Sequence, residues 1–181
     1  MASEKFKALV HYIVASCNDP QRLGATRLNK ICWYADTLTY RYGGTSISGE
    51  TYIKRRHGPV PRSILHAIRE LENEKRIGVR DHQILPGRKI RLFSALKDAD
   101  ASIFAPEERD IIDFVVQHIC KEHTATSISE LSHNAIWEAA NDGEEIPMSA
   151  TLVAAPAQMT SKVIAWADGV VKKKAGRLNA A

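Results

Sequence analysis

Residues 28–44 read LNKICWYADTLTYRYGG, and the spacing of apolar residues here decides the fold expected for the first half of the chain. They recur three or four positions apart, as on one buried stripe of an α-helix: Leu28, Ile31, Cys32, Ala35, Leu38 and Tyr42. Thr26 is placed to cap the start of this helix through its hydroxyl. Gly43 and Gly44 end it, because glycine enters the left-handed region at little cost.

The segments on either side predict another helix and a strand. A similar apolar stripe runs from Phe6 to Cys17 and ends at the sequence Asn-Asp-Pro of residues 18–20. After the glycines, residues 46–56 favour β-structure, and their side chains alternate in character around 50–54.

Prolines and a second group of short strands follow. The sequence GPVP at 58–61 predicts a rigid turn, with Pro61 in the first position of a helix that reaches about Glu74. Residues 77–79 and 89–93 predict two further strands with a Pro-Gly turn between them.

The second half of the chain is expected to be helical. A proline followed by two glutamates at 106–108 is typical of a helix start, and Ser127-x-x-Glu130 matches a capping box. Two more helices and a basic tail are expected at 135–140, 160–173 and 172–177.

These elements place the chain in the α+β class, mainly α-helical. The order of the first six predicts a winged-helix-like N-terminal part with a small antiparallel three-stranded sheet, followed by a C-terminal helical block. We expect a single domain over residues 1–155, and a C-terminal helix with a basic tail over 156–181.

Composition excludes several classes of protein. With 181 residues, 44% hydrophobic and 25% charged, the chain is no disordered segment, collagen-like repeat or disulfide scaffold. It has neither a signal peptide at its start nor a run of ~20 apolar residues, so we expect a cytoplasmic protein without membrane contact. Cys17, Cys32 and Cys120 fall on helix stripes, and we interpret them as buried thiols rather than redox or metal sites.

The charges are segregated along the sequence although the net charge is only +4. Residues 54–91 hold eleven basic and four acidic residues, a net of +7, whereas residues 98–150 hold two basic and twelve acidic residues, a net of −10. Two interpretations stay open: the blocks neutralise each other, or the basic one forms a face for an anionic protein or nucleic acid.

The sequence offers no catalytic constellation. It lacks a phosphate-binding glycine loop and the HExxH, CxxC and GxSxG patterns. An enzyme or metalloprotein would depend on the isolated pairs Ser132-His133 and Cys120-x-x-His123. We therefore expect a non-enzymatic protein without a cofactor or metal.

Two segments carry more polar and aromatic residues than plain structure requires. Asn29, Lys30, Trp33 and Asp36 lie off the apolar stripe of their helix, so they are expected on its polar face. A tryptophan there suggests cover by another element or by a partner. The second segment is RRHGPVP at 55–61.

Together these residues resemble the Panacea, or SocA-like, antitoxin domain. The resemblance rests on an ordered series that runs through LNK at 28–30, YAD at 34–36, Tyr42-Gly43, Ile47-x-Gly49, Tyr52 and GPVP at 58–61. A later block is similar as well: Leu131-Ser132-His133, Trp137, Gly143 and Ile146-Pro147.

The resemblance implies an antitoxin of a type II toxin–antitoxin system that neutralises a cognate protein toxin by direct binding. Such proteins are found in bacteria and their prophages, and one member of the family is an adaptor that delivers its toxin to a ClpXP-type protease. A winged-helix-like DNA-binding autoregulator remains the alternative, and homo-oligomerisation stays open.

Aromatic residues and arginine dominate interface energetics, and they lead our candidates for partner binding: Lys30, Trp33, Tyr34, Asp36, Tyr52, Arg55 and His57. Other motif positions are expected to be mainly structural: Asn29, Gly58, Pro59, Pro61, Ser132, His133 and Trp137. In that structural interpretation, Asn29 and Asp36 tie their helix to the turn at 58–61, and Trp137 fills the junction between the two blocks.

Overall fold

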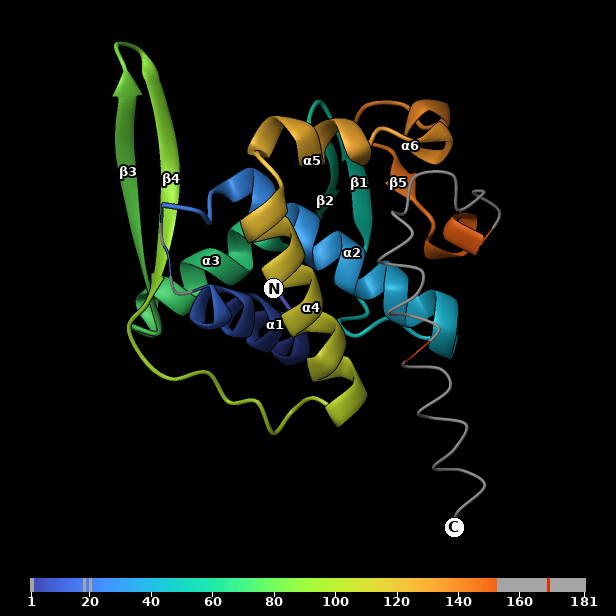
Figure 1. Ribbon diagram of the computed structural model, residues 1–181, viewed down its shortest axis with the longest axis horizontal. Helices are drawn as coiled ribbons and strands as arrows, with labels where there is room; N and C mark the ends of the chain where they lie inside the picture. Colours follow the sequence, from blue (N-terminus) through green and yellow to red (C-terminus); the bar gives the residue numbers. More distant parts are fainter. Residues whose placement is uncertain (1, 18, 20, 153–168, 170–181) are drawn as a thin grey trace.

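A bundle of helices carries two small antiparallel sheets in this protein (Figure 1). The computed structural model describes residues 2–17, 19, 21–152 and 169. Apart from Gly169, the helix predicted over 160–173, the basic tail and the C-terminal segment 156–181 lie outside the described residues. The α+β, mainly α-helical class is confirmed.

The four longest helices in the described part of the chain are α1 (Glu4–Ser16), α2 (Ala25–Gly43), α3 (Ile64–Asn73) and α4 (Pro106–Glu122). Their apolar stripes form the core, as the spacing predicted: Phe6, Leu9, Ile13, Leu28, Ile31, Leu71, Ile112 and Val115 are all buried. The short helices α5 (Ala125–Leu131) and α6 (Ala135–Ala139) and the 3-10 helix η1 (Met148–Leu152) follow α4.

Helix ends agree with the sequence in part. The αL residue Gly44 ends α2, and Pro106 begins α4, both as predicted. Thr26, however, is not the cap of α2, because the helix begins two residues earlier than predicted and its N-cap is Gly24. Likewise α5 begins after Thr124, whose hydroxyl accepts from the backbone N–H of Ser127, so the capping box predicted at Ser127 is wrong.

The first sheet has the order β2-β1-β5 and is antiparallel. It consists of β1 (Tyr52–Arg55), β2 (Gly58–Pro61) and β5 (Glu145–Ile146). GPVP is therefore an edge strand rather than a turn, and α3 begins at Ile64 instead of Pro61. Prolines hold the backbone extended, and an edge strand tolerates their missing N–H groups.

The second sheet is a hairpin of β3 (Ile77–Leu85) and β4 (Arg88–Ala95), which projects from the helices at one side (Figure 1). The three strands predicted from sequence thus divide between two sheets. A three-stranded sheet is present, but β5 from the second block completes it. Periodicity identifies a strand without identifying its neighbours, which explains the difference.

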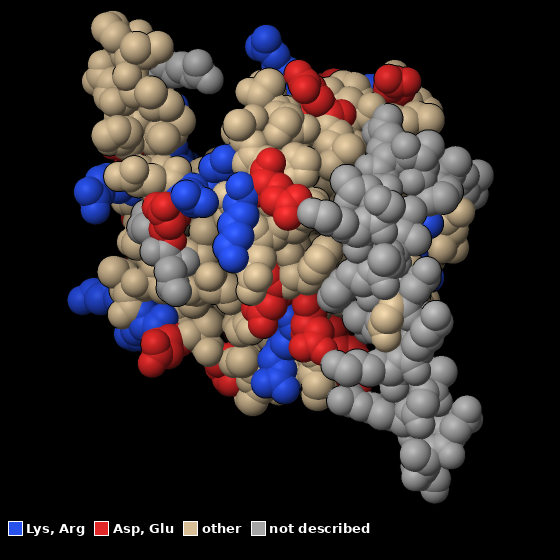
Figure 2. All heavy atoms as spheres, viewed as in Figure 1, with Lys and Arg blue, Asp and Glu red and all other residues tan. Residues whose placement is uncertain are grey.

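Some residues of the basic block, 54–91, form ion pairs with residues of the acidic block, 98–150. Arg55 pairs with Asp142 at 3.5 Å, and Arg62 pairs with Glu145 at 3.3 Å, so two ion pairs join the basic block to the acidic one. On the face shown in Figure 2, Lys and Arg side chains are interspersed with Asp and Glu. On this face, the mixed charges support the interpretation that the basic and acidic blocks neutralise each other, rather than the interpretation that the basic block forms one basic surface.

Candidate functional site

A buried lysine joins α2 to the edge strand β2. Lys30 is only 1% exposed, and its Nζ donates to the carbonyl oxygen of Pro59 at 3.0 Å. Burial lowers the pKa of Lys30 to about 7, because the charged ammonium is deprived of water. The sequence placed this side chain on a polar helix face, and that prediction is wrong.

Gly58 leaves the space into which this lysine reaches. Its φ is +100°, and a Cβ at this position would lie 2.2 Å from both Lys30 Nζ and Ser132 Oγ. Real Cβ atoms essentially never approach other atoms so closely. The glycine therefore permits both the backbone conformation and the close packing of two polar side chains.

Helix α5 and the residue after it, Ser132, also contact this region. Ser132 Oγ donates to the carbonyl oxygen of Ser129 at 2.7 Å, and Ser129 Oγ donates to that of His57 at 3.0 Å. The segments LNK, GPVP and LSH, distant in sequence, thus meet in one buried polar contact. Ser129 was not among the predicted site residues, because nothing in its spacing distinguishes it from other serines.

Asp36 forms the second half of the same arrangement. This carboxylate is fully buried and accepts from the Ser48 backbone N–H at 2.9 Å, from the Ser48 hydroxyl and from the Tyr52 hydroxyl at 2.7 Å. Burial raises the pKa of Asp36, while these hydrogen bonds oppose the rise. Trp33 packs edge-on against Tyr52, with ring centroids 4.9 Å apart. Asp36 therefore fastens α2 to β1 and to the loop before it.

We call the buried set the motif junction; it comprises Lys30, Asp36, Tyr52, Gly58, Pro59 and Ser132. Two predictions about it need correction. Trp33 is 3% exposed rather than on a polar face, and Lys30, not Asn29 or Asp36, binds the 58–61 segment. Among the described residues, no side-chain hydrogen bond from Asn29 reaches that strand. Buried side chains of this kind offer no surface to a partner in this conformation.

An aromatic side chain marks the surface beside the junction. Trp137 stacks on His133 with ring centroids 3.8 Å apart, and its Nε1 donates to the carbonyl oxygen of Arg55 at 3.1 Å. Lys54 Nζ lies 4.2 Å from the centroid of the Trp137 ring and donates to the carbonyl oxygen of Ala140 at 2.8 Å. Trp137 thus links the two sequence blocks, as predicted for a structural role.

Three exposed residues follow Lys54 in the chain. Arg55, Arg56 and His57 are exposed at the turn between β1 and β2, whereas Tyr34 is half-buried in α2. We call the set Lys54, Arg55, Arg56, His57, His133 and Trp137 the Trp137 face. Of the predicted partner-binding residues, Arg55 and His57 belong to it. Lys54 and Arg56 were missed, although both fall in the basic run that the sequence shows.

His133 has an unusual environment within this face. Its Nε2 is buried and has no hydrogen-bond partner in the described part of the chain. Burial lowers the pKa of His133, and the neighbouring Lys30 and His57 lower it further. The ring is therefore neutral at pH 7 and stacks on Trp137 as an uncharged aromatic.

The structure shows where the isolated pairs Ser132-His133 and Cys120-x-x-His123 lie. Within residues 2–17, 19 and 21–152, no three His, Cys, Asp or Glu side chains are grouped so that they could hold a metal ion. Cys120, half of the predicted Cys-x-x-His pair, contacts Cys17 instead. Ser132 is fully buried and donates to a backbone carbonyl, which leaves its hydroxyl no access to a substrate.

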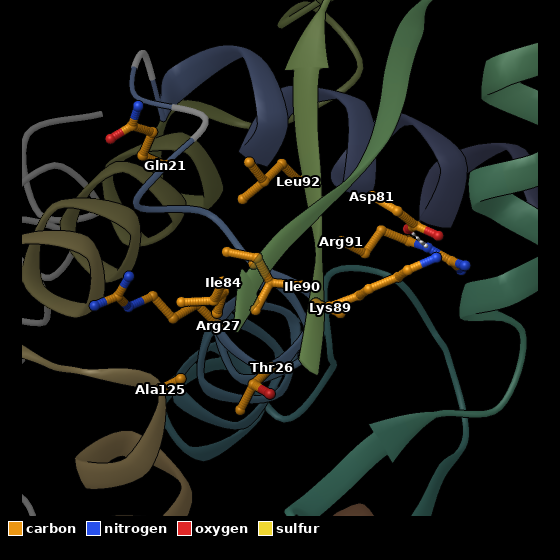
Figure 3. Close-up of a pocket in the computed structure, with 12 residues that line it drawn as sticks. Gln21, Thr26, Arg27, Asp81, Ile84, Lys89, Ile90, Arg91, Leu92 and Ala125 are labelled. Atoms are coloured by element: carbon orange, nitrogen blue, oxygen red, sulfur yellow. Dashed lines mark hydrogen bonds and ion pairs between the residues drawn. The ribbon is translucent and has the colours of Figure 1, made fainter. Parts of the chain in front are cut away.

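A hollow of about 560 Å³ lies elsewhere, between the N-terminus of α2 and the hairpin (Figure 3). Thr26 and Arg27 line it from α2, and Ile84, Ile90 and Lys89 line it from the hairpin. The guanidinium of Arg27 already has a hydrogen-bond partner, because its Nε and Nη2 donate to the carbonyl oxygen of His123 at 3.0 and 2.5 Å. None of the lining residues belongs to the motif series.

The fold is a helical body with a buried polar centre, the motif junction. Residues 28–138 match the family model described as "Antitoxin SocA-like, Panacea domain". This match covers more than half of the chain, which therefore belongs to the SocA-like Panacea family, as its motifs suggested. Gly143 and Ile146-Pro147 lie beyond the matched residues.

Neither the curated proteins nor the solved structures give a significant match to the chain. No helix among the described residues is both long and apolar enough to cross a membrane.

Proposed function

We propose that this protein is the antitoxin of a type II toxin–antitoxin system and neutralises a cytoplasmic toxin by binding it through the Trp137 face. The observation that carries the proposal is the array of Lys54, Trp137 and His133 beside the exposed residues of the β1–β2 turn. Family membership supports an antitoxin, and tryptophan and arginine are the residues that most often dominate binding energy.

The chemistry of this face indicates what a toxin surface would provide. Lys54 lies over the half-buried indole of Trp137, and two further cationic residues, Arg55 and Arg56, follow it directly in the chain. Arg55 forms an ion pair with Asp142, whereas no ion pair to Arg56 is present among the described residues. A complementary toxin surface would carry carboxylates around an apolar recess, so association would be accelerated at low salt.

Co-expression with the neighbouring reading frame tests the function. We expect that frame to arrest growth when expressed alone, and growth to recover when this chain is expressed with it. A neighbouring frame that is harmless alone would refute the antitoxin proposal.

Charge reversal then tests the face. The double variant Arg56→Glu with His57→Glu should lose rescue without a change in Tm, because both side chains are exposed and make no described ion pair. Arg80→Glu on β3 is the matched control, since Arg80 is also exposed but lies on the projecting hairpin. Full rescue by the double variant would place the toxin interface elsewhere and leave the antitoxin function standing.

DNA binding is the second candidate, supported by the projecting hairpin after α3. This element order is winged-helix-like, and the exposed side chains of Arg80 and Lys89 lie on the two hairpin strands. A gel shift on the upstream DNA would show an affinity that falls steeply with salt, because phosphate contacts release counterions. Arg80→Glu should weaken that binding while toxin rescue stays intact; a shift that Arg80→Glu leaves unchanged contradicts this second candidate.

A further inference from the structure

Two of the three cysteines meet in the core although 103 positions separate them. Cys17 follows the last residue of α1, and Cys120 lies in the last turn of α4. Their Sγ atoms are 3.1 Å apart, and both side chains are buried, with 6% and 8% exposed. Cys32 is fully buried in α2, and no contact between its sulfur and either of the others occurs among the described residues.

The two sulfur atoms have different acidities. The hydrogen bond with Cys120 lowers the pKa of Cys17, and the positive charge of Arg27 lowers it further. The same hydrogen bond, together with burial, raises the pKa of Cys120. The lowered pKa of Cys17 favours its thiolate, which is the form that reacts with oxidants. Cys32 lacks this help, because burial raises its pKa well above the ordinary value.

We propose that Cys17 and Cys120 are an oxidation-sensitive dithiol, which hydrogen peroxide converts into a disulfide between the ends of α1 and α4. The Cys17 thiolate attacks one oxygen of the peroxide, the O–O bond breaks, and a sulfenic acid and hydroxide form. The Cys120 sulfur then attacks the Cys17 sulfur, the S–O bond breaks and the S–S bond forms. Overall, two thiols lose two electrons and two protons, and the peroxide becomes two molecules of water.

The cross-link would affect the stability of the whole domain. The closed segment from Cys17 to Cys120 contains α2, α3 and the strands β1 to β4. A disulfide across so long a segment restricts the unfolded chain strongly, so we expect Tm to rise by roughly 5–15 °C on oxidation. The contact joins residues already adjacent in the core, so the helices need little movement to accept the bond.

The test uses the full chain, purified in the reduced form and treated with hydrogen peroxide. After denaturation and alkylation with iodoacetamide, we expect one labelled cysteine, Cys32, and a proteolytic fragment in which Cys17 is linked to Cys120. Tm should rise and return to its starting value with dithiothreitol. The same peptide map of the unsubstituted protein decides the question even if a cysteine variant fails to fold.

Single substitutions supply the controls. Cys32→Ala should gain the same Tm shift as the unsubstituted protein, whereas Cys17→Ala and Cys120→Ala should gain none. Three labelled cysteines after peroxide, a disulfide between two chains, or a Tm shift that persists in Cys17→Ala would each overturn the proposal.

Discussion

Replacing Gly58 by alanine tests whether the motif junction holds the fold together. The new Cβ would lie 2.2 Å from Lys30 Nζ and from Ser132 Oγ, at a backbone φ of +100°. Both neighbouring atoms are ends of side chains, but both side chains are buried and have little room to turn away. Lys30 would also have to leave the carbonyl oxygen of Pro59, to which it donates at 3.0 Å.

The expected loss of stability is the sum of two effects. Placing a side chain at this φ costs about 1–3 kcal/mol. Crowding in a packed interior costs about 1–3 kcal/mol more. We therefore expect Gly58→Ala to lower the free energy of unfolding by roughly 2–6 kcal/mol, which corresponds to a Tm about 4–24 °C lower.

Urea denaturation of Gly58→Ala and of a matched control measures this loss. Gly87 also has a positive φ, +78°, but a Cβ there would meet no atom within 4 Å. Gly87→Ala should therefore cost only the backbone strain. Equal losses for the two variants, within about 0.5 kcal/mol, would refute the reasoning from crowding.

A double variant separates crowding from strain. Lys30→Ala removes one of the two atoms that the new Cβ would meet, so part of the damage in Gly58→Ala should disappear when both are combined. We expect the combined loss to be at least about 1 kcal/mol smaller than the sum of the single losses. Strict additivity would mean that Lys30 does not resist the alanine.

Three further predictions concern buried ionisable groups. The folded-state pKa of Lys30, about 7, lies below its ordinary value of 10.5. Between these two values the folded state binds fewer protons than the unfolded state, so stability rises with pH. From pH 7 to 9 the free energy of unfolding should increase by up to ~2.7 kcal/mol relative to that of Lys30→Met. Asp36→Ala leaves the Tyr52 hydroxyl and the Ser48 N–H buried without their acceptor, so urea denaturation should show a loss of roughly 3–5 kcal/mol. The exposed Asp98→Ala is the control and should show no measurable loss. Burial lowers the pKa of His11 below its ordinary value of 6.5 in the folded state. Its contribution to stability is therefore present above pH 6.5 and is lost as the pH falls below 6.5. Thermal melts from pH 7.5 to 5 should show a smaller decrease in Tm for His11→Gln than for the unsubstituted protein.

The sequence predicted helices better than it predicted their surroundings. The stripes of α1, α2 and α4 are buried as expected, except for Tyr42, which is 38% exposed at the C-terminal end of α2. A 3.6-residue period indicates directly which side of a helix faces the core. The spacing of polar residues does not indicate whether they are buried or exposed. Lys30 and Asp36 lie off the apolar stripe, yet both are buried, since distant segments supply the carbonyl, hydroxyl and N–H groups that make their burial tolerable.

The same limit explains the wrong strand prediction and the contact between Cys17 and Cys120, about which the sequence made no prediction. GPVP was expected to turn, because prolines disfavour helices and central strands, but the edge of a sheet accepts them. The partner of Cys17 is 103 residues away, and no local pattern could reveal it. Contacts between segments far apart in the chain therefore account for most of the differences.

The location of the family motifs has a consequence for specificity. The residues that most clearly mark the family, Lys30, Asp36 and Gly58, are buried in the motif junction and support the structure around it. A toxin cannot contact them without unfolding the region that they hold together. If the chain binds a toxin as proposed, specificity must reside in exposed residues that the junction positions, such as Arg56 and His57 on the β1–β2 turn.

This division predicts two kinds of mutational effect. Substitutions in the junction should reduce stability and toxin binding together, because they displace the turn that carries the exposed side chains. Substitutions at the exposed Arg56 and His57 of the Trp137 face should reduce toxin binding while Tm stays within about 2 °C of the unsubstituted protein. A panel containing Gly58→Ala and Arg56→Glu, measured for both quantities, would contradict the division if Arg56→Glu lost stability or if Gly58→Ala retained it.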